Sequence, residues 1–176
     1  MNRSLPHDLT RPAPPTHTAY VGLGSNLGDR RAHLDAALAE LGRLPNTDVS
    51  RVSRFHDTPP LGPPDQGRFL NAVAELHTPL PPRMLLDRML DIESRLGRPP
   101  RDQRTHWGPR TIDLDLLLHG DTILDQAGLT LPHPGMAQRR FVLEPLAELA
   151  PQLLHPSEGR TVSQLLAACE AVEVSG

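Results

Sequence analysis

The sequence contains no lysine, since all 18 of its basic residues are arginine. This absence excludes a lysine-containing phosphate loop, a lysine Schiff base and a lysine general base. A single cysteine cannot form a disulfide within the chain, which is typical of a reducing compartment. The formal net charge of -3 gives no broad basic field, so we expect no binding to nucleic acid. No apolar run reaches the roughly 18 residues that a membrane span needs, so we expect a soluble, cytoplasmic protein.

Proline is frequent, at 20 of 176 residues, about twice the usual ~5%. Several prolines fall in the first 17 residues, which are polar and lack the apolar segment of a signal peptide. We therefore predict that residues 1–17 form a disordered tail and that residues 18–176 form a single domain.

Hydrophobic periodicity predicts a β-α-β-β-α-β order for the core. Strands are expected at 18–23, 49–56, 69–76 and 111–119, and the two core helices at 29–44 and 83–96. A short strand pair around 122–131 and helices at 141–149 and 162–172 would follow. Proline-rich residues 57–68 and polar residues 98–108 read as loops. This order favours an α+β, ferredoxin-like fold, in which an antiparallel sheet carries two helices on one face and leaves the other face free.

Local signals predict some details of these elements. Asn26 or Asp29 would cap the first helix, and Gly97 would end the second. The glycines from Gly22 to Gly28 follow a G-x-G-x-x-x-G spacing, which differs from the dinucleotide fingerprint, so we attribute them to packing and turn geometry. In the strand at 111–119, alternation places Ile112, Leu114, Leu116 and Leu118 on one face.

Two acids on that strand are the strongest chemical signal. Asp113 and Asp115 are two residues apart, so they point to the same face. Paired carboxylates repel each other unless a cation lies between them, and hard oxygen ligands beside substrate phosphates suit Mg²⁺. A solvated strand face that happens to carry two acids is the alternative, and a bare D-x-D motif does not decide between them.

Arginines precede the acid pair in unusual density. Five of them fall within a stretch of 16 residues: Arg95, Arg98, Arg101, Arg104 and Arg110. Guanidinium groups bind phosphate oxygens in a bidentate way, so acids and arginines together indicate a polyphosphate site. Ordinary solvated charges remain the alternative, above all for Arg95 and Arg104.

Other candidate chemistry is weak. The histidines show no zinc-site spacing, and His133, between two prolines, reads as a structural or loop residue. Ser25 has no evident His or Asp partner for nucleophilic catalysis. The chain holds only three phenylalanines, one tyrosine and one tryptophan. Some of these could stack on a flat heterocycle, although packing explains each of them singly.

Four segments together resemble the 6-hydroxymethyl-7,8-dihydropterin pyrophosphokinases of folate biosynthesis. They are Gly22–Asn26, then 58–62 (TPPLG) with 69–71 (FLN), then 107–115 (WGPRTIDLD), and finally 131–133 (LPH) leading to Arg139 and Phe141. The resemblance runs from about Ala19 to Pro156. It implies a ferredoxin-like fold and transfer of pyrophosphate from ATP to the pterin hydroxymethyl oxygen, which releases AMP.

The resemblance also implies roles for particular residues. Asp113 and Asp115 would hold two Mg²⁺ ions, and Arg98 and Arg110 would join them in catalysis at the triphosphate. The pterin would be stacked by two rings, read by an amide and enclosed by a loop, through Phe69, Phe141, Asn71, Thr58, Pro59 and Leu61. The ATP site would further comprise Glu93, Arg101, Trp107, Thr130, His133 and Arg139.

Some positions depart from the family. The arginine loop is about two residues longer, so the sequence leaves open whether Arg101 or Arg104 is its second arginine. Leu90, Gly128 and Pro134 stand where the family often has a polar, an arginine and an aromatic side chain, which suggests an altered grip on the nucleotide. The general base is also open, with Asp115 or a water as candidates. We expect a monomer that binds only small molecules. The alternatives are another Mg²⁺-dependent D-x-D transferase for nucleotidyl or glycosyl groups, and a non-catalytic ATP-binding module.

Overall fold

The computed structural model describes residues 15–60, 66–99 and 108–174. The chain folds around a five-stranded antiparallel sheet. Its strands are β1 (His17–Ser25), β2 (Asp48–Val52), β3 (His56–Thr58), β4 (Phe69–Thr78) and β5 (Asp113–His119). The main strand order is β2-β4-β1-β5. Strand β3 also pairs with β4, at residues 69–71 where β4 begins.

This order interleaves two β-α-β units. Helix α1 (Arg30–Leu41) connects β1 to β2, and α2 (Pro82–Arg95) connects β4 to β5. Strand β4 lies between β1 and β2, while β1 lies between β4 and β5. The predicted α+β class is therefore confirmed, and the interleaving agrees with a split β-α-β core.

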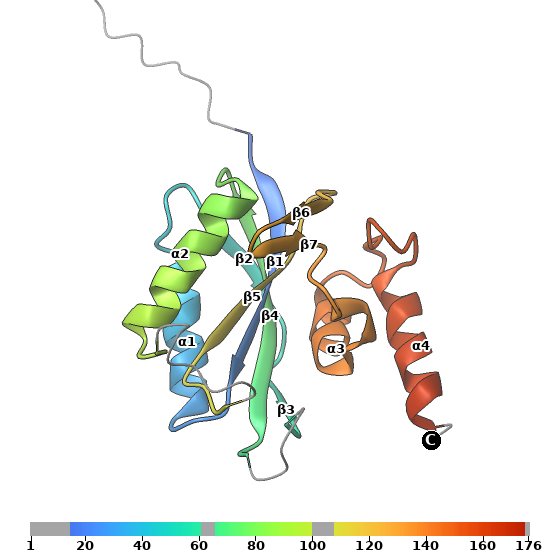
Figure 1. The fold of residues 1–176 in the computed structure, drawn as a ribbon, viewed down its shortest axis with the longest axis horizontal. Helices are drawn as coiled ribbons and strands as arrows, with labels where there is room; N and C mark the ends of the chain where they lie inside the picture. The colour runs from blue at the N-terminus through green and yellow to red at the C-terminus, as the bar shows by residue number, and fades with distance from the viewer. Residues whose placement is uncertain (1–14, 61–65, 100–107, 175–176) are drawn as a thin grey trace, which may run out of the picture.

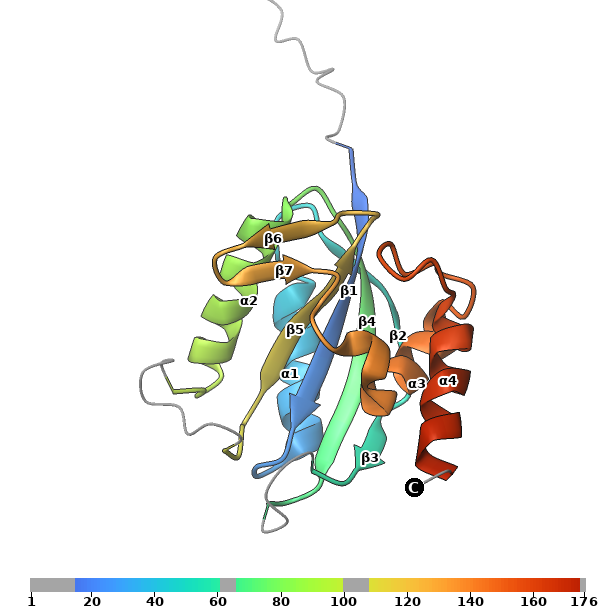
Figure 2. The same ribbon diagram turned by 45° about the vertical axis from the view of Figure 1, so that its right-hand side comes forward.

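Helices cover both faces of the sheet (Figure 1). Helices α1 and α2 lie together on one face, as predicted. The opposite face carries α3 (Arg140–Leu149), with α4 (Val162–Val174) packed against it. A small hairpin of β6 (Leu124–Gln126) and β7 (Leu129–Leu131), followed by the 3₁₀ turn Met136–Gln138, connects β5 to α3 (Figure 2).

Each face of the sheet has its own apolar core. The core under α1 and α2 includes Val21, Leu23, Leu34, Ala74, Leu85, Met89 and Ile92. The core under α3 includes Tyr20, Val73, Leu117, Leu143 and Leu146. Because alternate residues of β1 and β4 enter opposite cores, the central strands are buried on both sides.

The helix boundaries follow local rules. Asp29 caps α1, since its Oδ1 accepts the Ala32 N–H at 3.0 Å. Pro81 and Pro82 stand at the start of α2, where a missing N–H costs nothing. Gly97 follows the end of α2 at φ +89°, a conformation that favours glycine. The prediction for Gly97 is confirmed, and of the two proposed caps for α1 only Asp29 is right.

The first strand is longer than predicted at both ends. It begins at His17, which pairs with Thr78, so β1 takes the last residue of the segment expected to be a tail. Residues 1–14 lie outside the described residues. At the other end, Gly22 and Gly24 are inside the strand and pair with Asp115 and Asp113. The turn explanation for these glycines is therefore wrong, and it holds only for Gly28, at φ +57°.

Two further predictions are corrected by pairing. The predicted strand 49–56 breaks into β2 and β3, and β3 extends over residues 57 and 58, which were assigned to the proline-rich loop. In β5, an extra residue opposite the Tyr20–Val21 step shifts the register. Leu118 consequently joins the core under α3 rather than the face of Leu114 and Leu116.

Candidate active site

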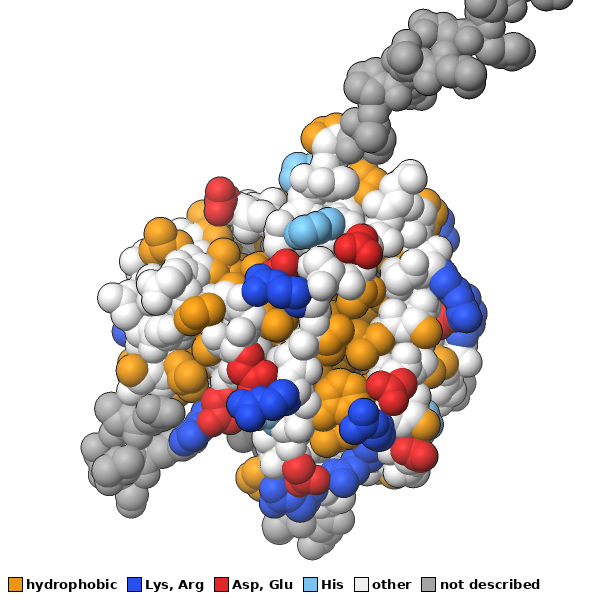
Figure 3. Space-filling model, turned by 180° about the vertical axis from the view of Figure 1, so that it is seen from behind, with side chains coloured by type: hydrophobic (Ala, Val, Ile, Leu, Met, Phe, Trp, Pro, Cys, Tyr) orange, Lys and Arg blue, Asp and Glu red, His pale blue; other side chains and the backbone are white. Residues whose placement is uncertain are grey.

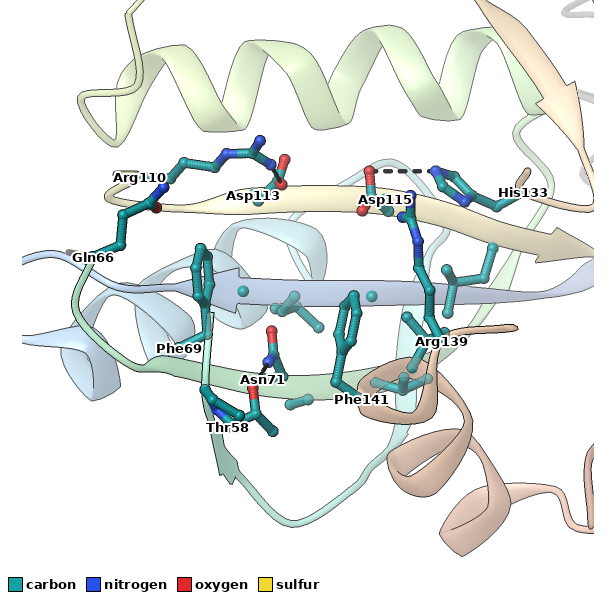
Figure 4. Close-up of a pocket in the computed structure, with 18 of the residues that line it drawn as sticks. Thr58, Gln66, Phe69, Asn71, Arg110, Asp113, Asp115, His133, Arg139 and Phe141 are labelled. Atoms are coloured by element: carbon teal, nitrogen blue, oxygen red, sulfur yellow. Dashed lines mark hydrogen bonds and ion pairs between the residues drawn. The ribbon is translucent and has the colours of Figure 1, made fainter. Parts of the chain in front are cut away.

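A cavity of about 370 Å³ lies on the α3 side of the sheet and is bounded by β1, β4, β5 and the start of α3. Two aromatic rings flank it. Phe69 is the first residue of β4, and Phe141 is in the first turn of α3. Their rings project into the same space, on either side of Asn71 (Figure 4). The pair forms the walls of a slot that suits a flat ring.

The polar edge of this slot comes from Asn71. Its Nδ2 donates to Thr58 Oγ1 at 2.8 Å, which directs the amide and ties β4 to β3. Pro59 lines the same cavity beside Thr58. An amide that is 7% exposed retains hydrogen-bonding capacity for a ligand in the slot.

Opposite the rings stand the two acids. Asp113 and Asp115 occupy alternate positions on β5 and both face the cavity, as predicted (Figure 4). Ile112, Leu114 and Leu116 pack behind them in the core. The cavity walls remove water around Asp115, and Asp113 adds repulsion, so the pKa of Asp115 is raised above its usual 3.8. This electrostatic strain is what a cation between the acids would relieve.

Two arginines form ion pairs with Asp113. Arg98 pairs with its Oδ1 and Arg110 with its Oδ2. The Arg98 side chain is only 10% exposed and also pairs with Glu93. These guanidinium groups place positive charge at the acid pair, and guanidinium groups can bind the oxygens of an anionic ligand.

A second cavity, of about 300 Å³, adjoins the first. Both cavities are lined by Arg98, Asp113, Asp115 and His133, so they meet at the acid pair. The second is otherwise bounded largely by α2 and the β6–β7 hairpin. Leu90, Gly128 and Pro134, three positions at which the sequence was expected to depart from the family, all line it.

Glu93 and Thr130 line this second cavity, but their side chains already have partners. The Glu93 carboxylate is 1% exposed and accepts the Leu114 N–H at 2.7 Å. Thr130 Oγ1 donates to Asp125 Oδ1 at 3.1 Å. Glu93 is therefore placed to support Arg98 and the β5 backbone.

The other residues considered in the sequence lie at the acid pair, in the first cavity, at the end of β1 or outside the described residues. His133 lines both cavities, and its Nε2 lies 3.7 Å from Asp115 Oδ1. Arg139 lines the first cavity and not the second. The sequence suggested no His or Asp partner for Ser25, but the structure places its Oγ 3.5 Å from His33 Nδ1. The predictions for Leu61, Arg101, Arg104 and Trp107 lie outside the described residues.

Sequence reasoning missed several residues of the site. Gly22, Gly24 and Gln66 line the first cavity, and Asn26 holds its edge together. The glycine spacing was the available signal, because glycines two apart on a strand open the same face for a ligand. Asn26 ends one of the segments that carry the family resemblance, but its contacts with Gly67 and Arg110 are distant in sequence and could not be predicted. Nothing local marked Gln66.

The donor set at the acid pair fits magnesium. In the described part of the chain, no cluster of three or more His, Cys, Asp and Glu side chains could enclose a metal ion. Two carboxylates facing a cavity, with arginines beside them, instead match the partial coordination that Mg²⁺ completes with phosphates and water.

Charged side chains of both signs are mixed on one face of the molecule. On the face in Figure 3, arginine and acidic side chains are interspersed. No large field of one sign is visible among the coloured residues of that face. Among the described helices, none is both long and apolar enough to cross a bilayer.

Comparisons with known proteins agree with this geometry. The sequence profile described as 7,8-dihydro-6-hydroxymethylpterin-pyrophosphokinase (HPPK) matches residues 20–151. The 2-amino-4-hydroxy-6-hydroxymethyldihydropteridine pyrophosphokinase of Pseudomonas aeruginosa is 52% identical over 85% of this chain and 90% of its own. The protein of that name from Synechocystis is 42% identical over 90% of this chain and 79% of its own.

A solved structure shows the same fold. It is an HPPK-DHPS protein in complex with substrates, with a TM-score of 0.69 and 12% identity over 90% of this chain. This chain spans 44% of that protein's length. The profile and the curated relatives together show that the chain belongs to the 7,8-dihydro-6-hydroxymethylpterin-pyrophosphokinase family.

Proposed function

We propose that this protein transfers pyrophosphate from ATP to the hydroxymethyl oxygen of 6-hydroxymethyl-7,8-dihydropterin, in tetrahydrofolate biosynthesis. The products are the pterin diphosphate and AMP. One observation carries the proposal: two cavities meet at Asp113 and Asp115, and only the first is flanked by a pair of phenylalanine rings. The names of the curated relatives describe the same reaction.

The flat pterin would occupy the first cavity. Phe69 and Phe141 would stack on its faces, while Asn71 would pair with its polar edge. Thr58 holds the Asn71 amide, so the hydrogen-bonding edge is oriented before the ligand arrives. The hydroxymethyl group would then point across the sheet toward β5.

ATP would occupy the second cavity, with its phosphates at the junction. Arg98 and Arg110 would exchange Asp113 for phosphate oxygens. Arg139 stands near Asp115 to add positive charge, and His133 Nε2 lies 3.7 Å from Asp115 Oδ1. The apolar wall that includes Leu86 and Leu90 would bound the nucleoside end. Positioning and charge neutralisation supply most of the catalysis in phosphoryl transfer.

Asp113 and Asp115 would hold two Mg²⁺ ions, which neutralise phosphate charge and polarise oxygens when bound. In the transfer itself, the pterin oxygen forms a bond to the β-phosphorus. The bond from that phosphorus to the oxygen shared with the α-phosphate breaks, and its electron pair leaves with AMP. The hydroxyl proton departs to Asp115 or to a water.

AMP production is the direct test. The purified full chain should convert ATP to AMP only when the hydroxymethylpterin and Mg²⁺ are both present. Another D-x-D transferase would not need this acceptor, and a binding module would bind ATP without turnover. Absence of AMP with both substrates and Mg²⁺ present would refute the proposal.

The three phenylalanines of the chain provide a matched series for the pterin slot. Phe69→Leu and Phe141→Leu remove a ring but keep an apolar side chain, and we expect each to raise the pterin KM roughly tenfold through lost stacking. Phe55→Leu is the control, because Phe55 packs against the other core, under Arg31. Equal effects at all three positions would argue against the slot.

A further inference from the structure

Glu148, near the C-terminal end of α3, accepts a group of hydrogen bonds that join this helix to β3 and the residues before it. Its Oε2 accepts the backbone N–H of Arg54 at 2.9 Å. Its Oε1 accepts Nε and Nη2 of the Arg54 guanidinium at 3.1 and 2.9 Å, and His56 Nε2 lies 2.9 Å from the same oxygen. The side chains of Glu148 and His56 are only 23% and 20% exposed, so solvent competes little for the contact between them.

A second carboxylate of α3 extends this contact. Glu144 lies one turn before Glu148 on the same face of the helix. Its Oε2 is 4.0 Å from His56 Nδ1, and its Oε1 accepts Nε and Nη2 of Arg140 at 2.8 and 2.7 Å. Both ring nitrogens of His56 therefore face carboxylates of α3. We call the group Arg54, His56, Glu144 and Glu148 the α3–β3 clamp.

The α3–β3 clamp lines neither cavity, but it joins two elements that build the pterin slot. Strand β3 pairs with the start of β4, so that His56 lies opposite Asn71 and Thr58 lies opposite Phe69. Helix α3 carries Phe141 in its first turn, and β3 lies close to this helix (Figure 2). The position of α3 relative to β3 therefore decides where the Phe141 ring lies relative to the Asn71 amide.

The other contacts of these two elements are less specific. Leu143 and Leu146 of α3 pack with Val73 in the apolar core, and apolar attraction has no preferred direction. Strand β3 has three residues and pairs with β4, which is little support for a strand. Hydrogen bonds fix both distance and angle. Partial burial opposes the ionisation of Glu148, but the hydrogen bonds from Arg54 outweigh this effect and keep the pKa of the carboxyl below its usual 4.5.

We propose that Glu148 is a positioning residue for the pterin, because its bonds to Arg54 and His56 fix the Phe141 ring in place relative to the Asn71 amide. The inference rests on the proposed function. Loss of the α3–β3 clamp should displace one wall of the slot and weaken pterin binding. The cavity assigned to ATP should be unaffected, since it is bounded largely by α2 and the β6–β7 hairpin.

Glu148→Gln tests this role with little change in size. The amide has one acceptor oxygen in place of two, so it cannot satisfy Arg54 and His56 together. Calorimetry on the full chain, saturated with a non-hydrolysable ATP analogue and Mg²⁺, measures the pterin Kd. We expect this Kd to rise about tenfold, within the ~100-fold that a misplacement of about 1 Å can cause. The Kd of the analogue alone should change less than about twofold, because a purely local displacement is worth little at a distant site.

Arg54→Ala tests the other side of the α3–β3 clamp. The Arg54 side chain is 84% exposed, so its removal leaves the core intact. The backbone bond to Glu148 remains, and we therefore expect a smaller rise in the pterin Kd, of about threefold. The double variant Arg54→Ala with Glu148→Gln should be within about twofold of Glu148→Gln alone, because both changes act on one contact.

Leu166→Ala is the control for a general loss of stability. Leu166 belongs to α4 and packs against the core under α3, but it does not contribute to the α3–β3 clamp. The variant should lower the Tm, since it removes apolar contacts. Its pterin Kd should nevertheless stay within about twofold of the native value, because no element of the slot is released.

The outcomes separate the two proposals. A native pterin Kd in Glu148→Gln, or in Arg54→Ala if Glu148→Gln does not fold, overturns the positioning role and leaves the proposed function intact. An equal rise in Leu166→Ala, or an equal loss of affinity for the ATP analogue, overturns the positioning role as well. Failure of the native chain to bind the pterin in the presence of the analogue and Mg²⁺ would overturn both proposals.

Discussion

The Oδ1 atom of Asn71 lies 2.9 Å from the position that a Cβ atom of residue 24 would take. Gly24 therefore leaves room for the amide that forms the polar edge of the slot. A side chain at this position would push against an amide that Thr58 already holds from the other side. The glycine at this point of β1 is explained by this close approach, without any special backbone angle.

Gly24→Ala should displace the Asn71 amide and weaken pterin binding. We expect the pterin KM to rise about 10- to 100-fold, since misplacing a buried hydrogen-bonding group costs about 1–3 kcal/mol. Gly42→Ala is the control, because Gly42 lines neither cavity and its Cβ would meet its nearest neighbours at an ordinary 3.6 and 3.7 Å. Steady-state kinetics of both variants measure the difference, and a normal pterin KM in Gly24→Ala would contradict this account.

Asp115→Asn should lower turnover while it raises the thermal stability of the ligand-free protein. Turnover should fall at least about 100-fold if the carboxylate accepts the proton or holds a metal ion. The ligand-free variant should nevertheless melt higher at neutral pH, because burial and repulsion from Asp113 raise the pKa of Asp115 in the folded state. The Asp115 side chain is 45% exposed, so solvent screens part of this effect and we expect only a small increase in Tm.

The pH dependence of that stabilisation has a definite sign. A raised carboxyl pKa means that the charged form is less stable in the folded than in the unfolded protein. The Tm advantage of Asp115→Asn should therefore vanish below the ordinary pKa of 3.8, grow above it and level off above the raised pKa. Asp121→Asn, at an exposed turn, is the control. An advantage that grows toward acid pH would be inconsistent with the raised pKa.

Glu93→Gln should destabilise the fold as well as the site. Glutamine can still accept the Leu114 N–H, but the buried ion pair with Arg98 is lost. Because Arg98 keeps Asp113 as a partner, we expect a loss of about 2 kcal/mol, or roughly 4–8 °C in Tm. Glu158→Gln removes an exposed carboxylate near Arg160 and should have little effect. A weaker affinity for ATP with an unchanged Tm would instead indicate direct contact between Glu93 and the nucleotide.

Tyr20 offers a spectroscopic test of the core under α3, since it is the one tyrosine in the chain. Burial, followed by the hydrogen bond to Glu75 Oε2 at 3.0 Å and the charge of that carboxylate, raises the pKa of Tyr20 to about 12. Phenolate absorbance should therefore appear well above pH 10 while circular dichroism still reports a folded chain. Glu75→Gln should lower the midpoint. Ionisation near pH 10 in the folded protein would disprove the arrangement.

Elements with strong periodicity were predictable, and irregularities were not. Helices α1 and α2 follow from apolar spacing, prolines at a start and glycine at an end, which are local effects. The bulge that moves Leu118 to the other core depends on how β5 pairs with β1, and the short strand β3 depends on an available edge of β4. Neither pairing leaves a local signal in the chain.

The sequence by itself determined the chemistry that is available. Two acids on one face of a strand, a dense group of arginines and a few aromatic side chains indicated a polyphosphate site beside a flat ligand. Only the tertiary structure decided how these groups meet. It brought Phe69 and Phe141 to one slot, joined two cavities at Asp113 and Asp115, and placed Asn26 between two distant segments. The reason is physical: alternation along a strand is set by neighbouring residues, whereas contacts between distant segments are set by how the sheet pairs and which cores it buries.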